Sequence, residues 1–505
     1  MPLINIVQTP IFSDIIHEYR FYVDKTEYLY HLINDQKAKI LCRPWGFGKT
    51  LLVDTLEELF HGNQDLFANL WIAASDYKFV KHPVIRLNFG FPESITPTEL
   101  NHRIFNDLQR IALSEALPIN ALNPDSPLED LIVNLLKKYN PNLPDVSLEE
   151  SDLGANLTKV VILIDDYDAP IIAAFNDTAL ATSLQQTLSE FYRSFHNLEK
   201  YCHFILLTGQ TKLGYGEVGP NATNFLDISY LPKYSGICGF TTHELDNLIA
   251  NRFDQIAPEL IHKNQFQVGQ TAADLKKLIL LWYNGYYFDG YTVFDQKNQE
   301  KMVKVFNPYS ILTFFERKAF DNYWIQAHQE DFLTDIIAQK PERFIGYDFS
   351  GYSKLTLLYV NNPPIGLFLF QTGFLTMKET SISHGQMSYN LKIPNLEISL
   401  SFRKALLKIL FDIASVEDLQ NTQKNVQKGL ASQNQFDLEE IFALAVARLT
   451  FRPPRPGDFF YRVVFHLFIY CLGFDTDPDD PSEVNRLELV KKSFAATHYP
   501  LENDR

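Results

Sequence analysis

The stretch Arg43-Pro44-Trp45-Gly46-Phe47-Gly48-Lys49-Thr50 stands between an apolar run at residues 38–42 and a helical pattern at residues 51–60. A strand, a glycine-containing loop that ends in Gly-Lys-Thr, and a helix form the usual setting of a phosphate-binding loop. In such a loop the glycines let backbone N–H groups turn inward, the lysine places its charge on the phosphates, and the threonine hydroxyl is available to Mg²⁺. Arg43 stands where the motif has its first glycine, so the loop by itself leaves a chance match open.

A second signal lies at residues 159–164, an apolar run that leads into Asp165, Asp166 and, two residues on, Asp168. Such a run predicts a strand buried on both faces of a parallel sheet, and the carboxyl ends of such strands are where open α/β sheets bind ligands. We expect Asp165 to hold Mg²⁺ through water and Asp166 to orient or activate the attacking water. The alternative is a core strand that ends in a solvated acidic turn, and the upstream Gly-Lys-Thr favours nucleotide binding over it.

A third apolar run, at residues 202–207, ends in Thr208, Gln210 and Lys212. Nucleotide-binding proteins with this loop often carry a polar sensor at the end of the strand that lies between the other two. We expect Thr208 and Gln210 to hydrogen-bond the γ-phosphate or the attacking water, and Lys212 to meet developing charge. A strand-end turn with a surface lysine is the alternative, and for Lys212 both interpretations stay open.

The chain resembles the AAA-ATPase-like proteins that carry a PD-(D/E)xK nuclease-like domain at the C-terminus. Residues 21–26 resemble the family's YxVDKT step, residues 43–50 its RPRRFGKT loop, and residues 164–170 its IDEYDxP block. The resemblance therefore implies that arginine is the family's usual residue at the first position of this loop, where Arg43 stands. Further stretches that resemble family blocks, in order, are residues 208–209, 239–241, 282–286, 306–310, 371–376 and 393–397. The resemblance implies an ATP-binding site that uses Mg²⁺.

Two departures from the family pattern matter for activity. Asp166 stands where the family has glutamate, and its carboxylate sits about 1.5 Å further back; misplacement on this scale costs on the order of 100-fold in rate. At the C-terminus, residues 459–474 resemble the opening helix of the nuclease-like domain. Glu488 and Glu502 could bind a metal weakly there, but no lysine follows in the expected pattern. Because such a nuclease needs two acids and a lysine, we predict a degenerate or truncated domain without cleavage activity.

We therefore predict an α/β fold of the P-loop NTPase type. A parallel-sheet ATPase domain is expected at residues 1–235, a helical lid at 236–343, a connector at 344–400 and a degenerate nuclease-like domain at 401–505. Within the first domain, strands are expected at 38–42, 83–89, 159–165 and 202–208, and helices at 50–61, 98–116 and 178–196. The aromatic block at 282–288 is expected to be core.

Composition limits the partners. A hydrophobic content of 46% and a charged content of 21% are ordinary for a soluble protein, and a net charge of −16 argues against broad binding to nucleic acid, which stays open only as a local contact. The four cysteines are far apart in sequence, which favours free thiols in a reducing cytoplasm. No signal-peptide pattern and no 18-residue apolar stretch is present, so we expect no membrane association.

The sequence thus favours an ATP-binding protein, a slow ATPase whose nucleotide state controls the C-terminal module. One alternative is a non-hydrolysing nucleotide switch that acts as a scaffold for protein partners. Another is an active, ATP-regulated, Mg²⁺-dependent nuclease, against which the missing lysine argues. Because the arginine that completes such sites usually comes from a neighbouring subunit, a homo-oligomer is possible.

Overall fold

The computed structural model describes residues 11–18, 20–35, 38–90, 94–118, 121–142, 157–212, 225–292, 303–328, 330–339, 341–344, 352, 355, 364–383, 385–432, 435–450 and 458–474. The chain divides into two compact units. Unit 1 comprises Met1–Phe320 and Ser350–Pro394, and unit 2 comprises Asp321–Phe349 and Asn395–Arg505. The boundaries expected near residues 235, 343 and 400 stay predictions.

Unit 1 is built around a five-stranded parallel sheet in the order β2-β3-β4-β1-β5. Its strands are β1 (Lys39–Cys42), β2 (Val84–Asn88), β3 (Val160–Asp165), β4 (Cys202–Gly209) and β5 (Leu226–Asp227). Every residue of β1 and β3 is buried, as their continuous apolar sequences predict for strands covered on both faces. The four strands predicted from the sequence are confirmed, whereas β5 was not foreseen because two residues carry no periodic signal.

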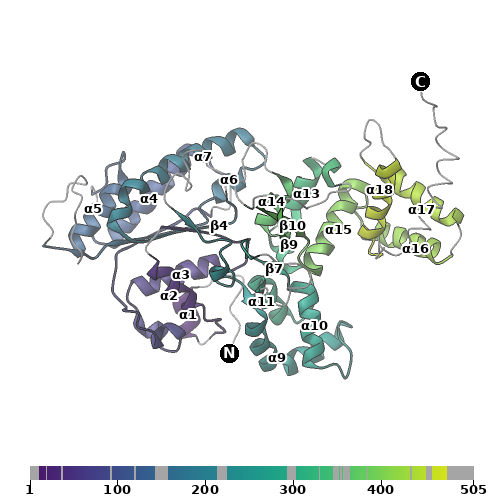
Figure 1. Cartoon of the computed structure of the whole chain (residues 1–505), viewed down its shortest axis with the longest axis horizontal. Coiled ribbons are helices and arrows are strands. Elements are labelled where there is room, and N and C mark those ends of the chain that lie inside the picture. The colour runs from purple at the N-terminus through teal and green to yellow at the C-terminus, as the bar shows by residue number, and fades with distance from the viewer. Residues whose placement is uncertain are drawn as a thin grey trace. The chain divides into compact units, whose positions relative to one another are not determined.

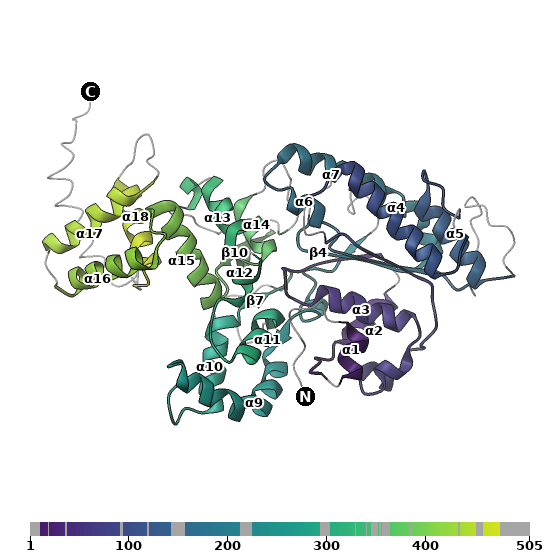
Figure 2. The ribbon, with the colours of Figure 1, turned by 180° about the vertical axis from the view of Figure 1, so that it is seen from behind.

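Helices cover both faces of this sheet. Figures 1 and 2 show α4, α5 and α7 on one face and α1, α2 and α3 on the other. The helices of unit 1 are α1 (Phe12–His17), α2 (Thr26–Asn34), α3 (Lys49–Phe60), α4 (Pro97–Ser114), α5 (Pro127–Tyr139), α6 (Ala169–Ala173), α7 (Thr178–Arg193), α8 (Phe195–Leu198), α9 (Thr242–His262), α10 (Ala272–Tyr283), α11 (Pro308–Arg317) and α14 (Ile365–Thr372).

Helix α4 illustrates how the sequence specifies these elements. Thr96 and Glu99 form a capping box at its start, with Glu99 accepting from the Thr96 N–H at 2.8 Å. Its buried residues recur every four positions, at Leu100, Ile104 and Leu108, so that one stripe faces the sheet. The three helices predicted at 50–61, 98–116 and 178–196 are confirmed as α3, α4 and α7.

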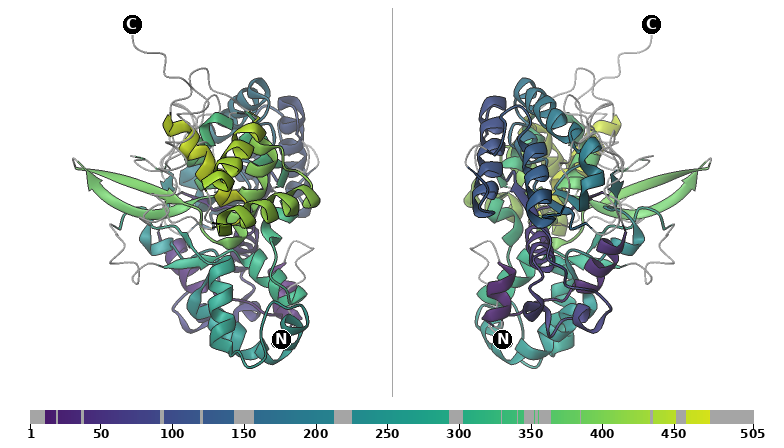
Figure 3. Two further views of the ribbon diagram at one scale, coloured as in Figure 1. Left: turned by 90° about the vertical axis from the view of Figure 1, so that its right-hand side faces the viewer. Right: turned by 90° about the vertical axis from the view of Figure 1, so that its left-hand side faces the viewer.

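A second, three-stranded antiparallel sheet in unit 1 has the order β6-β8-β7, and α9 packs against its strands β6 and β8. Its strands are β6 (Phe240–Thr241), β7 (Tyr286–Tyr287) and β8 (Lys304–Phe306). The aromatic block contributes to the core as predicted, since Tyr283, Tyr286, Tyr287 and Phe288 are all buried. A hairpin of β9 (Thr376–Ser383) and β10 (Gln386–Lys392) also belongs to this unit and protrudes from the rest of it (Figure 3).

In the described part of unit 2, every regular element is helical. The helices are α12 (Tyr323–His328), α13 (Glu330–Gln339), α15 (Leu396–Phe411), α16 (Val416–Ser432), α17 (Gln435–Arg448) and α18 (Asp458–Cys471). Glu397 is fully buried there and accepts a hydrogen bond from the Trp324 N–H at 2.8 Å. Glu488 and Glu502 lie outside the described residues, so the nuclease-like domain stays a prediction. Across the described ranges, no helix is both long and apolar enough to cross a membrane.

Candidate functional site

The loop between β1 and α3 has the backbone of a phosphate-binding loop. Gly46 and Gly48 adopt φ angles of 82° and 92°, which residues with a side chain rarely reach. Gly48 is the N-cap of α3, so the unpaired N–H groups of the first helical turn and the positive end of the helix dipole face the loop. A Cβ on Gly48 would meet nothing within 4 Å, whereas one on Gly46 would lie 2.8 Å from Asn307 Oδ1.

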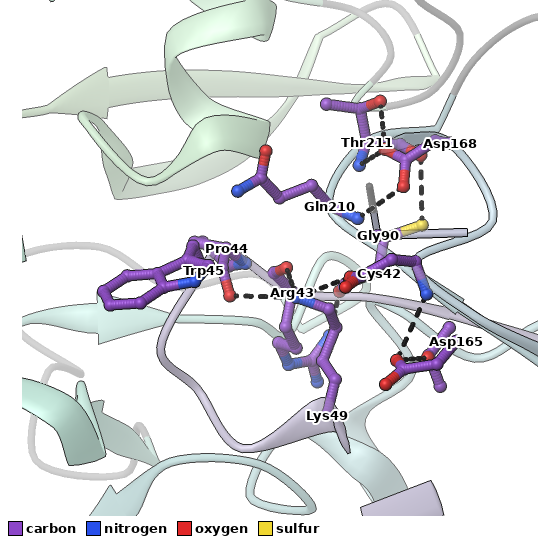
Figure 4. Close-up of polar contacts among 12 residues, drawn as sticks. Cys42, Arg43, Pro44, Trp45, Lys49, Gly90, Asp165, Asp168, Gln210 and Thr211 are labelled. Carbon is purple, nitrogen blue, oxygen red and sulfur yellow. Dashed lines mark hydrogen bonds and ion pairs between the residues drawn. The ribbon is translucent and has the colours of Figure 1, made fainter. Parts of the chain in front are cut away.

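Lys49 begins α3, and its ammonium group turns back over the loop (Figure 4). Its Nζ donates to the carbonyl oxygens of Arg43 at 3.1 Å and Pro44 at 3.4 Å, and lies 3.8 Å from Asp166 Oδ1. The side chain is only 6% exposed. A buried cation held this loosely by carbonyls suits an anionic ligand that offers stronger charge-assisted bonds.

Arg43 is directed away from the inner side of the loop. Its guanidinium donates to three backbone carbonyls, those of Cys42 at 2.8 Å, Ser229 at 2.5 Å and Tyr234 at 2.9 Å. The group also stacks over the ring of Phe288, 4.2 Å from its centroid. Arg43 therefore anchors the start of the loop, and its side chain does not point at the place where the loop would meet phosphate.

The strand order brings Asp165 and Asp166, here called the acid pair, close to the loop. Because β4 lies between β1 and β3, the carboxyl ends of the three strands meet at one edge of the sheet. Asp165 is fully buried there, and its Oδ1 accepts from the Thr208 hydroxyl at 2.5 Å and from the Asp166 N–H at 3.1 Å. Its Oδ2 is buried and has no hydrogen-bond partner among the described residues. This free carboxylate oxygen suits a cation.

Asp166 follows β3 in a left-handed conformation, with φ of 51°, which aspartate tolerates better than most residues. Its side chain is 33% exposed and faces Gly90, where a Cβ would come within 2.8 Å of Asp166 Oδ2. Burial raises the pKa of Asp166 to about 6, with Asp165 and Asp168 adding to the rise and Lys49 opposing it. An acid with this pKa can exchange a proton near neutral pH.

Asp168 has a structural task that the sequence did not reveal. It is buried and accepts hydrogen bonds from the N–H of Gln210 at 3.0 Å and from the N–H and hydroxyl of Thr211, both at 2.6 Å (Figure 4). Burial raises its pKa while these bonds lower it. Gly209 is required beside it, since a Cβ there would lie 2.4 Å from the Tyr167 ring. Asp168 thus fixes the turn that follows Thr208.

Lys212 is held on the β5 side of the sheet. Its ammonium pairs with Asp227 and lies over the ring of Tyr230, 4.2 Å from the centroid. Its N–H donates to the side chain of Gln371 at 2.8 Å. The side chain is buried, so it is not the surface lysine of the alternative interpretation, and its charge is already matched by a carboxylate.

Sequence reasoning missed the residues that contact the loop from behind, that is, on the side to which the carbonyl groups of residues 45–47 point. The N–H of Gly239 donates to the Phe47 carbonyl at 3.1 Å, the side chain of Asn307 to the Trp45 carbonyl at 2.9 Å, and the N–H of Tyr309 to the Gly46 carbonyl at 3.3 Å. The Asn-Pro step at 307–308 signals the start of a helix. Nothing local indicates that this helix begins against the loop.

Two oxygens at the site could serve a metal ion. Thr50 is the second residue of α3 and is partly exposed, and Asp165 offers its unpaired Oδ2. Mg²⁺ takes oxygen ligands and keeps several waters, so this pair fits that ion. Within the described ranges no group of three or more His, Cys, Asp or Glu could hold a metal, so further ligands would come from phosphate and water.

Comparisons with known proteins agree with this geometry. A family model described as "Predicted AAA-ATPase" matches residues 7–218, the part of the chain that carries the loop, the acid pair and Thr208. An uncharacterized protein in the vnfD 5' region of Azotobacter chroococcum mcd 1 is 27% identical over 483 residues, 93% of this chain and 83% of that protein. The match to this family model and the geometry of the site together support an ATP-binding, ATPase-like role.

Among solved structures, a chain of the Drosophila ORC bound to GC-rich DNA and Cdc6 is similar over 61% of this chain and 93% of its own length. The identity is 13% and the TM-score is 0.18. A likeness this low carries no argument about fold or partner.

Proposed function

We propose that the protein binds Mg²⁺-ATP at the loop of residues 43–50 and hydrolyses it slowly. The single observation that carries the proposal is the meeting of Lys49, Asp165 and Asp166 at one edge of the sheet, with Lys49 Nζ 3.8 Å from Asp166 Oδ1. A phosphate-binding loop and two carboxylates in this arrangement provide for charge neutralisation, metal binding and water activation, the three tasks of phosphoryl transfer to water.

Each residue has a distinct part in this reaction. The loop N–H groups and Lys49 bind the phosphates, Thr50 and Asp165 hold Mg²⁺, which supplies neutralisation of developing phosphate charge, and Thr208 keeps Asp165 in place. Asp166 orients the attacking water and accepts its proton. Arg43 fixes the loop from outside. Lys212 would act on developing charge only when released from Asp227.

Slow turnover is expected because Asp166 is shorter than glutamate. A base whose carboxylate is set back by one methylene positions water poorly. The short side chain of Asp166 also favours a second candidate function, a nucleotide switch that binds ATP without hydrolysing it. Control of a C-terminal nuclease-like module, a homo-oligomer and a nucleic-acid or protein partner remain proposals that rest on the sequence alone.

Calorimetric titration with Mg²⁺-ATP, followed by steady-state phosphate release, tests the proposal. Lys49→Ala removes the cation that faces the phosphates and should weaken binding at least 100-fold. Lys277→Ala is the matched control, since this lysine is 77% exposed on α10. Equal affinity of wild type and Lys49→Ala would refute the site, and binding without phosphate release would leave the switch.

A further inference from the structure

Five consecutive carbonyl groups of the loop, those of residues 43–47, accept hydrogen bonds. The first two, at Arg43 and Pro44, accept from the Lys49 ammonium on the side that would face the phosphates. The next three, at Trp45, Gly46 and Phe47, accept from residues outside the loop, namely the Asn307 side chain, the Tyr309 N–H and the Gly239 N–H. The contacts reach across 262 residues in the case of Asn307 and Trp45.

Holding a carbonyl also orients the N–H of the following residue. In a planar trans peptide the C=O and the N–H of the same unit point in opposite directions. Fixing the Trp45 oxygen against Asn307 therefore turns the Gly46 N–H to the opposite side. By the same geometry, the bond to the Gly46 oxygen orients the N–H of Phe47, and the bond to the Phe47 oxygen orients the N–H of Gly48. These are the donors that a phosphate-binding loop presents.

The small antiparallel sheet supplies this support from one end. Phe240 of β6 pairs with Phe306 of β8, so Gly239 just before β6 and Asn307 just after β8 lie at the same end of the pair. Gly239 has φ of 88°, and a Cβ there would lie 3.0 Å from the Phe306 oxygen, so this close approach needs glycine. The sheet and the start of α11 thus form one surface against the loop.

Side chains reinforce the same contact. The Phe47 ring packs edge-on against Tyr286 of β7, with centroids 4.9 Å apart, and the Trp45 ring lies 4.7 Å from that of Tyr309. The loop is therefore docked through both its side chains and its carbonyls. The ordering of its N–H groups is completed before any ligand arrives, which lowers the entropy lost on binding.

We propose that Asn307 is a positioning residue of the nucleotide site, which sets the direction of the Gly46 N–H through the Trp45 carbonyl. Asn307 is fully buried and uses both ends of its amide: Nδ2 donates to Trp45, and Oδ1 accepts from the Tyr309 N–H at 2.9 Å as the N-cap of α11. The inference rests on the proposed binding of ATP and names the residue that arranges its phosphate donors.

Two substitutions separate this role from helix capping. In Asn307→Asp the carboxylate still caps α11 but cannot donate to Trp45, and its charge faces a carbonyl oxygen. In Asn307→Ser the hydroxyl keeps the cap but is too short to reach the Trp45 carbonyl. Asn395→Asp is the matched control, because Asn395 caps α15 by accepting from the Ile398 N–H at 3.1 Å and its Nδ2 has no partner among the described residues.

The experiment is calorimetric titration of the full chain with Mg²⁺-ATP, with thermal melting of each variant. Both Asn307 variants should bind ATP about tenfold more weakly at unchanged stoichiometry, since one buried hydrogen bond that orients a donor is lost. Asn395→Asp should bind within twofold of wild type. A purely structural role would instead lower the number of competent sites and leave the affinity of the remaining sites unchanged.

The outcomes are distinguishable. If wild type fails to bind ATP, the proposed function is wrong and this inference fails with it. If wild type binds and both Asn307 variants bind equally well, or lose only stoichiometry, Asn307 does not position the loop. An equal loss of affinity in Asn395→Asp also overturns the inference. Where Asn307→Asp does not fold, Asn307→Ser, which keeps a good capping residue, decides the matter.

Discussion

The hydroxyl of Thr208 donates a 2.5 Å hydrogen bond to Oδ1 of Asp165, across the neighbouring parallel strands β4 and β3. Both side chains are fully buried. Because β4 lies between β3 and β1, this bond joins Asp165 to the strand that neighbours β1 and its loop. It leaves the other oxygen of Asp165 without a partner among the described residues and therefore available to a cation.

Thr208→Val keeps the shape of the side chain and removes the hydroxyl. The buried carboxylate of Asp165 loses a partner, so we expect the free energy of unfolding to fall by about 1–3 kcal/mol and ATP turnover to fall with it. Denaturant titration and phosphate release measure the two effects. Thr211→Val is the control, because Thr211 donates at 2.6 Å to Asp168, which serves the turn. A comparable loss of turnover in Thr211→Val would contradict a specific role for Thr208.

Asp166→Glu should raise the rate of ATP hydrolysis by about tenfold or more if the short carboxylate limits turnover. The side chain is partly exposed, so an added methylene can extend toward the ligand. The left-handed backbone suits aspartate better than glutamate, so a small loss of stability is expected. ATP affinity is the internal control and should change little. An unchanged rate would show that Asp166 is not the acid that activates water.

Asp166→Asn tests the raised pKa through stability. Since the carboxyl titrates at about 6 in the folded protein and near 3.8 ordinarily, protonation stabilises the fold below pH 4, and this stabilisation is lost as the pH rises through 6. The neutral asparagine avoids that loss. The melting temperature of Asp166→Asn relative to wild type should therefore rise between pH 4 and 6 and stay level at higher pH.

Thermal melts of the two proteins at several pH values decide this prediction. Asp168 is present in both proteins, and its charge adds to the raised pKa of Asp166, so the difference reports Asp166 together with its coupling to Asp168. A difference that does not vary with pH would mean that Asp166 titrates at its ordinary value. The rate of ATP hydrolysis by wild type should likewise fall as the pH drops below about 6, since a protonated Asp166 cannot accept a proton.

Arg43→Gly restores the first glycine of the usual loop motif, yet we expect it to destabilise the protein by about 3 kcal/mol. The carbonyls of Ser229 and Tyr234 would lose a buried charged donor, and the space over Phe288 would empty. Denaturant titration measures the loss. Arg43→Ala removes the same contacts without the added backbone freedom of glycine, so the difference between the two variants gives the effect of that freedom. Arg110→Ala, at a position 77% exposed, is the surface control. Unchanged stability with tighter ATP binding would contradict the anchoring role.

Local sequence predicted the parts of the molecule that depend on neighbours in the chain. Apolar runs identified β1, β3 and β4, because strands covered on both faces are rich in apolar residues. A strand was also expected at residues 83–89, where β2 lies, although β2 contains Arg86 and Asn88. The glycines and Lys49 identified the loop, because its backbone angles and charge are properties of those residues themselves. The very short strands β5 to β8 escaped prediction, since two or three residues show no period.

The same contrast applies to the individual side chains of the site. The sequence by itself determined that a loop with Gly46, Gly48 and Lys49 follows a buried strand, because these depend on residue type and near neighbours. Only the tertiary structure decided that Arg43 faces the carbonyls of Ser229 and Tyr234, 186 and 191 residues away, and that Asn307 holds the loop from behind. Such partners are chosen by packing of distant segments, and no local pattern records which buried carbonyl a donor will meet.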